Sequence, residues 1–330
     1  MARIGFHHEL NIYGEIQLFA GTSCTELAAE ISQYVNVPLS GRDIVLYPNE
    51  NLWIKLHKSV RWQDVYVIQT TSKPVHRNLM ELLILLQTLR LDSAGRVTAV
   101  IPYLCYARSD KKDKPRVPIT ARLVADMIEV AGADRYMTLD LHAGQIQGFF
   151  SIPGDVLTAF HLLTDYIKTR LPQMKDPVVV AADLGFAKKG RNFAVSMNAP
   201  IAFIEKRRAG QDNHPEAMTV IGDVKGHDVI IVDDEIDTAG SVDQAVKLVK
   251  KKGAGDVYLV TVHPVFSPPA SQRLAALPIK ELVVTNTIPI APETRELLKD
   301  KLTVLSVAPM LGEVIFRAHE GRSVGQMFDE

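Results

Sequence analysis

Eight short apolar runs recur along the chain, and their pattern constrains the fold more than any other feature. Within each run the apolar residues, mostly Val, Ile and Leu, follow one another directly instead of alternating with polar residues. Such runs are typical of strands buried on both faces, as in parallel sheets. The runs occupy residues 65–70, 97–104, 136–141, 177–183, 200–205, 228–234, 256–262 and 281–287.

Segments with the spacing of an α-helix lie between these runs. The clearest is "SVDQAVKLVKKKG" at residues 241–253, in which four apolar residues recur at i, i+3, i+4 and i+7. Its three consecutive lysines suit the negative end of a helix dipole, and Gly253 is a natural C-cap. Strands that alternate with helices predict an α/β fold with mostly parallel sheets flanked by helices.

The length of the chain and a break in its pattern indicate two domains. The chain has 330 residues, whereas one domain usually has ~100–200. The segment 149–156, which contains Pro and Gly, divides the strands and helices into two series. We expect a first domain at residues 1–154, a second at 155–314, and a tail at 315–330 that packs back on the first domain.

Composition and charge exclude several classes of protein. The net charge of −1 gives no basic field of the kind that nucleic-acid-binding proteins carry. The longest apolar block, residues 79–89, is shorter than the ~20 residues of a membrane helix and predicts a buried helix instead. The chain starts without a signal-peptide pattern, and its two cysteines, Cys24 and Cys105, suit a reducing compartment. We therefore expect a cytoplasmic protein with no nucleic-acid or membrane partner.

One of the apolar runs ends in an unusual acidic segment, "VIIVDDEIDTAGS" at residues 229–241. In a parallel sheet, ligands bind beyond the carboxyl ends of the strands, where Asp233, Asp234 and Asp237 are expected. The small residues after them allow backbone N–H groups to converge on a phosphate at the start of the next helix. Carboxylates beside such a cradle can accept hydrogen bonds from sugar hydroxyls or hold Mg²⁺. The segment therefore favours a phosphorylated sugar, and the alternative is an acidic loop that only caps a helix.

The same segment resembles the phosphoribosyl-diphosphate motif of type I phosphoribosyltransferases and of ribose-phosphate diphosphokinases. Further segments favour the diphosphokinases: "YARSDKKDKPRVPITARLVADMIEVAGADR" (106–135), "DLHAGQIQGFF" (140–150), "EKRRAG" (205–210), "ELVVTNTIPI" (281–290) and "HEGRSVGQMF" (319–328). The similarity covers nearly the whole chain and keeps its order, so the chain resembles the ribose-phosphate diphosphokinase family.

This resemblance implies both a reaction and an architecture. The family transfers the diphosphoryl group of ATP to the C1 hydroxyl of ribose 5-phosphate, with Mg²⁺, and gives 5-phosphoribosyl 1-diphosphate and AMP. Its subunits have two phosphoribosyltransferase-like domains and commonly form homo-oligomers, which predicts a hexamer built from dimers. Two alternatives stay open: a catalytically silent homologue that regulates an active partner, and a phosphoribosyltransferase, against which the ATP-side segments speak.

The resemblance also assigns roles to individual residues of the sugar site and of catalysis. Lys206 and Arg208 match a catalytic pair that stabilises the transition state, and Arg208 is also expected near the sugar phosphate. Without the resemblance, this short basic run would be read as a solvated patch. The residues matched to ribose 5-phosphate are Asp233, Asp234, Asp237, Thr238, Ala239, Gly240 and Ser241.

Metal and ATP sites follow from the same resemblance. His142 matches a Mg²⁺ ligand, direct or through water, although a lone His is more often structural. Asp183 matches the second position of the family's metal site. The guanidinium of Arg108 can stack on adenine and reach phosphate oxygens. The residues matched to ATP are Arg108, Ser109, Asp110 and Lys111, with Tyr47, Asn49, Glu50 and Asn51 contributed from a neighbouring subunit. As an alternative, residues 108–111 form an exposed charged loop.

The chain departs from the family at the nucleotide site. "YPNEN" at residues 47–51 stands where the family has Phe-x-Asp-Gly-Glu, and Ser109 stands where Gln is frequent. Asn donates as well as accepts hydrogen bonds, so adenine specificity is expected to be altered. Phe186 replaces a common glycine and is expected to narrow the metal and phosphate pocket.

The resemblance also implies a separate site between subunits, where phosphate activates and ADP inhibits many members of the family. Departures at the matching positions predict weakened or altered allosteric control. Lys114 and Pro115 stand where Arg-Ser is common, and Gly325 replaces a frequent Ser. The other matching positions, Ser59, Arg61 and Ser323, are kept.

Overall fold

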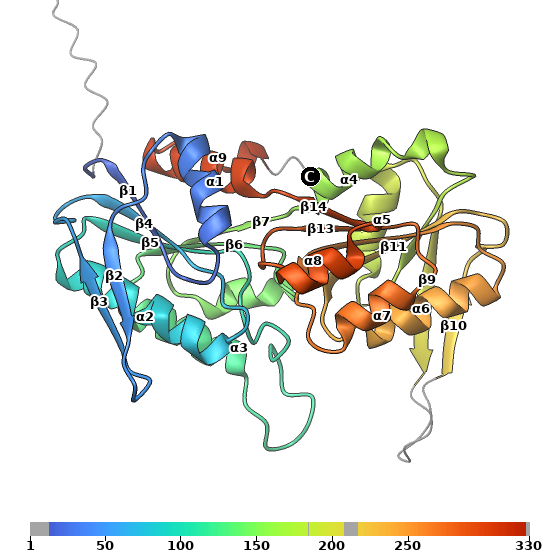
Figure 1. Cartoon of the computed structure of the whole chain (residues 1–330), viewed down its shortest axis with the longest axis horizontal. Helices are drawn as coiled ribbons and strands as arrows, with labels where there is room; N and C mark the ends of the chain where they lie inside the picture. The colour runs from blue at the N-terminus through green and yellow to red at the C-terminus, as the bar shows by residue number, and fades with distance from the viewer. Residues whose placement is uncertain (1–12, 184, 208–216, 328–330) are drawn as a thin grey trace, which may run out of the picture. The chain divides into compact units, whose positions relative to one another are not determined.

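The computed structural model describes residues 13–183, 185–207 and 217–327, and the chain divides into two compact units (Figure 1). Unit 1 combines Met1–Thr138, Ala143–Leu157 and Ala308–Glu330, and unit 2 combines Leu139–His142 and Thr158–Val307. The domains expected from the sequence, at residues 1–154, 155–314 and 315–330, remain predictions.

Unit 1 is built on a five-stranded sheet. Its strand order is β1 (Ile16–Ala20), β4 (Asp64–Ile68), β5 (Arg96–Ile101), β6 (Arg135–Leu139) and β7 (Gly154–Leu157). The pairs β1–β4, β4–β5 and β5–β6 are parallel. A separate antiparallel hairpin consists of β2 (Arg42–Leu46) and β3 (Leu52–Leu56).

Helices cover both faces of this sheet (Figure 1). On one face lie α1 (Thr25–Val35) and α9 (Ala308–His319), and on the other α2 (Val75–Leu91) and α3 (Thr120–Val130). The two helices of the first pair pack closely, because a Cβ at Gly312 would lie 2.5 Å from the ring of Tyr34. Two 3₁₀ turns complete the unit, η1 (Gly144–Phe149) and η3 (Gly325–Met327).

A buried polar network ties α9 to the sheet of unit 1. The fully buried carboxylate of Asp64 accepts two hydrogen bonds from Arg96, at 2.8 and 2.6 Å, and one from Tyr66 at 2.9 Å. His319, at the end of α9, lies 2.8 Å from the same carboxylate through Nδ1. Arg96 and Tyr66 also donate to the carbonyl oxygens of Ala318 and Ile315. Every partner of this buried charge therefore also connects to α9 or is part of it.

Unit 2 is built on a seven-stranded sheet. Its order is β10 (Ala217–Ile221), β9 (Ile201–Arg207), β8 (Val178–Ala181), β11 (Val229–Ile236), β12 (Val257–Pro264), β13 (Glu281–Thr285) and β14 (Leu302–Leu305). All neighbouring strands are parallel except β9 and β10, which are antiparallel. The helices are α4 (Phe160–Lys168) and α5 (Ala187–Ser196) on one face, with α6 (Gly240–Lys251), α7 (Ala270–Ala276) and α8 (Pro292–Leu298) on the other (Figure 1). A 3₁₀ turn, η2 (Leu171–Gln173), follows α4.

The predicted α/β fold with mostly parallel sheets is confirmed, and each of the eight apolar runs forms a strand. The predicted helix at 241–253 is α6, and Gly253 follows its C-cap with a positive φ of 91°. The block at 79–89 lies in the largely buried helix α2. Both cysteines are free and buried. In the described part of the chain, every helix is too short or too polar to span a membrane.

Candidate active site

Two acidic residues lie where the pairing of two parallel strands, β8 and β11, ends. The last paired residues are Ala181 and Val232, so Asp183 follows β8 and Asp233 is the first residue of β11 beyond this pairing, while β11 itself continues to Ile236. Burial raises the pKa of Asp233 well above its usual range, and the charges of Asp234 and Asp183 raise it further. This group of carboxylates therefore concentrates negative charge, which a cation or hydroxyl donors would relieve.

Asp234 is held by His142, one of the two predicted metal ligands. Its Oδ2 lies 2.7 Å from the His142 Nδ1, and its Oδ1 accepts a hydrogen bond from the amide of Glu235 at 2.9 Å. Burial alone would raise the pKa of Asp234, but the hydrogen bond and charge of His142 outweigh it and lower this pKa to about 2. Asp234 is therefore the ionised member of the pair that it forms with Asp233.

The segment that carries His142 is fixed by a strained residue, Asp140. Asp140 has a φ of 40°, in the left-handed region that non-glycine residues rarely adopt. Its buried carboxylate accepts hydrogen bonds from the Thr158 hydroxyl at 2.8 Å and from the Ala159 amide at 2.7 Å. Its carbonyl oxygen lies 3.3 Å from His263 Nε2. These hydrogen bonds hold the segment after β6 in the position from which His142 reaches Asp234.

His263 is a buried support of this site that the sequence reasoning missed. A carbonyl can only accept, so Nε2 carries the hydrogen toward Asp140, and Nδ1 can accept from the Thr287 hydroxyl at 3.0 Å. Burial lowers the pKa of His263 to about 4, so the ring is neutral near pH 7. It lies near the end of the buried strand β12, and only its partners, more than 20 residues away in sequence, reveal this role.

Lys189 of α5 is a second group that was missed. Its ammonium donates to the carbonyl oxygen of Leu141 at 3.2 Å and lies 5.8 Å from the ring of Phe186. Its charge contributes to lowering the pKa of Asp234. The sequence did contain a signal for this role, because a pair of lysines at residues 188 and 189 closely follows Asp183.

Asp183 and Phe186 form the turn between β8 and α5. The amide of Phe186 donates to Asp183 Oδ1 at 2.9 Å. The Phe186 ring is buried and packs 5.5 Å from the ring of Phe160, centroid to centroid. Because this packing places the ring in the hydrophobic layer between α4 and α5, its bulk is accommodated there.

The loop after β11 has the shape of an anion cradle. Ala239 adopts the left-handed conformation, with a φ of 59°, and its carbonyl accepts the first bond of α6 from the amide of Asp243 at 2.9 Å. Amides in the first turn of a helix have no intrahelical acceptor, and the helix dipole favours an anion beside them. Thr238 on this loop and Ser241 in the first turn of α6 are exposed and can add hydroxyl donors.

The predicted catalytic pair is only partly described. The backbone of Lys206 lies in β9 and pairs with Met218 of β10. Its side chain and the whole of Arg208 lie outside the described residues.

The predicted ATP residues lie in two parts of unit 1. Tyr47, Asn49, Glu50 and Asn51 form the exposed turn of the β2–β3 hairpin, where the amide of Tyr47 donates to the Asn51 carbonyl at 2.9 Å. The segment 108–111 follows β5: Arg108 and Lys111 are exposed, Asp110 is buried, and the Ser109 hydroxyl accepts from the Thr120 amide at 3.1 Å.

The chemistry of the predicted metal ligands is compatible with Mg²⁺. Within the described residues, no group of three or more His, Cys, Asp or Glu side chains could hold a metal by itself. Mg²⁺ is usually bound by one or two carboxylates, several waters and substrate phosphates, so Asp183 in this group of carboxylates suits it. His142 is already engaged with Asp234, which favours contact through water.

Comparison with known proteins identifies the family. The description "N-terminal domain of ribose phosphate pyrophosphokinase" matches residues 16–132, and "Phosphoribosyl synthetase-associated domain" matches residues 209–329. The ribose-phosphate pyrophosphokinase of Clostridium acetobutylicum is 45% identical over 315 residues, which cover 96% of this chain and 98% of that one. That of Listeria ivanovii is 46% identical over 315 residues, with the same coverage of 96% and 98%.

A solved structure agrees with these relatives. The crystal structure of phosphoribosylpyrophosphate synthetase from Mycobacterium smegmatis superposes with a TM-score of 0.88 and 41% identity, and the match covers 93% of this chain and 100% of that one. Both relatives and the solved structure extend over nearly the whole chain, as the sequence resemblance had predicted. The chain therefore belongs to the ribose-phosphate pyrophosphokinase family.

Proposed function

We propose that this chain transfers the diphosphoryl group of ATP to the C1 hydroxyl of ribose 5-phosphate. The products are 5-phosphoribosyl 1-diphosphate and AMP, which would serve nucleotide biosynthesis. The relatives reported above carry the name of the enzyme, which favours an active enzyme over a silent regulatory homologue.

The observation that carries this proposal is the group of carboxylates at the point where the pairing of β8 with β11 ends. Asp183, Asp233 and Asp234 gather there, and the anion cradle at residues 238–241 follows directly. A sugar phosphate needs both features, since its hydroxyls donate to carboxylates and its phosphate accepts from backbone amides.

Each group has a proposed task in the reaction. Asp233 and Asp237 hold the ribose hydroxyls, and the cradle holds the 5-phosphate. Lys206 and Arg208 stabilise the charge that develops on the diphosphoryl group, because such transfers depend mainly on positioning and electrostatics. When bound at Asp183 and His142, Mg²⁺ offsets the charge of the ATP phosphates.

On the nucleotide side, we propose that Arg108, Ser109, Asp110 and Lys111 contact ATP and that the turn at 47–51 supplies the adenine contacts of a neighbouring subunit. The altered turn is tested by comparing ATP with GTP and CTP as diphosphoryl donors. The triple variant N49D/E50G/N51E, which restores the Asp-Gly-Glu part of the family's pattern and keeps Tyr47 as the aromatic residue, should raise the preference for ATP. An unchanged preference would contradict a role of this turn in nucleotide selection.

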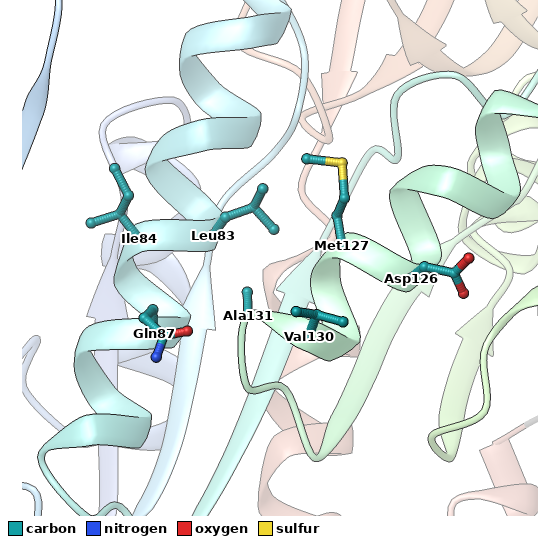
Figure 2. A pocket seen from close by; sticks show the side chains of 7 residues that line it. All are labelled: Leu83, Ile84, Gln87, Asp126, Met127, Val130 and Ala131. Atoms are coloured by element: carbon teal, nitrogen blue, oxygen red, sulfur yellow. The ribbon is translucent and has the colours of Figure 1, made fainter.

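A homo-oligomer, with a hexamer as its expected size, completes the proposal. Helices α2 and α3 expose several apolar side chains in unit 1: Met80, Leu91, Leu123 and Val130. Figure 2 shows side chains that line a pocket between the same helices, among them Leu83, Ile84 and Met127. The volume of this pocket is about 420 Å³. Exposed apolar surface of this kind favours association, and light scattering on the purified protein measures the assembly. The two buried thiols support the proposed cytoplasmic location.

The proposed reaction is tested by resolving the nucleotide products. Purified protein is incubated with ribose 5-phosphate, ATP and Mg²⁺, with reactions that lack ribose 5-phosphate as controls. AMP formed one-for-one with 5-phosphoribosyl 1-diphosphate supports the proposal. ADP as the product would mean transfer of a single phosphoryl group and would refute it. A folded protein without turnover would return the silent homologue to first place.

A further inference from the structure

Arg273 lies beside the anion cradle although no motif of the sequence points to it. It belongs to α7, which packs against α6, the helix that begins at the cradle (Figure 1). Its Nη1 donates a hydrogen bond of 3.0 Å to the carbonyl oxygen of Thr238. A side chain 35 residues further along the chain is thus bonded to the backbone of the cradle itself.

This hydrogen bond sets the orientation of one peptide group. The bond between Thr238 and Ala239 is trans, because the cis peptides of the described chain are two X-Pro bonds elsewhere. In a trans peptide the C=O and the N–H point in opposite directions. While Arg273 holds the Thr238 carbonyl on its own side, the amide of Ala239 faces the opposite side, away from Arg273. That amide is the first of the backbone N–H groups of the cradle, which continue into the first turn of α6.

The conformation of Ala239 explains why the neighbouring Thr238 carbonyl needs a hydrogen-bond partner. We call the hydrogen bond from Arg273 to this carbonyl the clamp. Its left-handed φ of 59° is disfavoured for a residue with a Cβ, and such residues persist only where their surroundings hold them. The carbonyl before it is held by Arg273, and its own carbonyl is held by the Asp243 amide. Both carbonyl groups that bracket the strained residue are therefore bonded.

The guanidinium approaches the loop so closely that a side chain at position 240 would press against it. A Cβ at Gly240 would lie 3.3 Å from Arg273 Nη1, which is tighter than ordinary van der Waals contact. The absence of a side chain at Gly240 therefore leaves room for the guanidinium of Arg273. The closeness of the two groups also places a permanent positive charge against the cradle.

We propose that Arg273 is a positioning residue for the phosphate of the sugar substrate. It fixes the Thr238–Ala239 peptide so that the cradle amides are ready for the phosphate before it binds. Preorganisation of this kind strengthens binding because the loop need not be ordered by the ligand. The inference rests on the function proposed above, since it takes ribose 5-phosphate as the ligand of the cradle.

The test compares four proteins: the wild type, R273M, R273K and the control R295M. Methionine keeps much of the length of arginine without charge or donors, and lysine keeps the charge and a donor. Arg295 of α8 is a matched control, because it too donates to a backbone carbonyl of unit 2, that of Ile290 at 3.2 Å. Inorganic phosphate and ribose 5-phosphate are titrated into each protein by calorimetry, and kcat and both KM values are measured.

R273M should weaken the binding of both anions by roughly tenfold, the usual effect of losing a hydrogen bond to a charged group. The KM for ribose 5-phosphate should rise by the same factor, while kcat and the KM for ATP stay unchanged. R273K should recover part of the loss, and R295M should match the wild type. A purely structural defect would instead lower kcat or affect both substrates.

Two results would refute the proposed positioning role of Arg273. One is binding by R273M within twofold of the wild type, and the other is equal weakening in R295M. If the wild type binds ribose 5-phosphate and R273M binds it equally well, only the clamp is refuted. If the wild type binds no ribose 5-phosphate, the proposed function fails first and the clamp fails with it.

Discussion

Removing the charge of Asp64 should weaken unit 1 selectively. The variant D64N keeps the size of the side chain, but it leaves the guanidinium of Arg96, whose side chain is 13% exposed, without its counter-charge. It also turns an amide NH₂ toward a set of donors, since Arg96, Tyr66 and His319 all approach the carboxylate within 3 Å. Breaking one partner of a buried pair costs about 3–5 kcal/mol. The free energy of unfolding of unit 1 should therefore fall by about that amount.

Hydrogen exchange measured by mass spectrometry at increasing urea concentrations can follow each unit separately. Peptides from β4 and α9 should open with a free energy lower by about 3–5 kcal/mol in D64N. Peptides from β11 in unit 2 serve as an internal control and should not change. D126N is the matched variant, because it removes an exposed pair with Arg122 in unit 1 and should leave exchange as in the wild type. A loss in β4 and α9 below about 1 kcal/mol, smaller than the cost of breaking any buried pair, would refute this reasoning.

Three further predictions concern His263, His142 and Gly154. The unfolded chain binds the His263 proton near pH 6.5 and the folded chain only near pH 4, so stability should fall by about 3 kcal/mol as the pH drops through this window. H263Q should flatten this slope in urea titrations followed by circular dichroism, and an equal slope would contradict it. H142A removes the main group that lowers the pKa of Asp234, which should rise from about 2 in an NMR titration. In the same variant the Mg²⁺ concentration for half-maximal activity should rise by about 10–100-fold, and an unchanged Mg²⁺ requirement would argue against a role at the metal. G154A places a Cβ 2.0 Å from the ring of Tyr136, so overpacking should destabilise the protein by about 1–3 kcal/mol and lower the Tm in calorimetry; an unchanged Tm would show that the ring moves freely.

The sequence predicted those parts of the fold that local pattern determines. The apolar run at 228–234 indicated a buried strand and the periodicity of 241–253 indicated a helix, and the structure has β11 and α6 there. The sequence also predicted that Asp233 and Asp234 lie in the last part of a parallel strand, whereas Asp183 was assigned to the site only through the family resemblance. The strands without such runs were not predicted: β1, β2, β3, β7, β10 and β14. Several of them are short, partly exposed edge or hairpin strands, in which burial leaves a weaker pattern.

The supports of the site could not be predicted, because they depend on contacts between distant residues. His263 reaches the carbonyl of Asp140 over 123 positions, and Arg273 reaches Thr238 over 35. Neither partner belongs to a periodic pattern, and a buried histidine in an apolar strand looks the same whether it supports a site or not. Sequence periodicity reports which face of an element is buried, whereas these contacts depend on which elements become neighbours.

The division of unit 1 along the chain has a consequence for how the protein emerges from the ribosome. The strands of its sheet are complete by Leu157, but α9 begins only at Ala308, after the 150 residues of Thr158–Val307. At ~5–20 residues per second, synthesis of that stretch takes roughly 8–30 s. During this interval the second unit has its main segment available and can fold. Until α9 is synthesised, the carboxylate of Asp64 lacks its contact with His319. The unit whose synthesis begins first is therefore completed last.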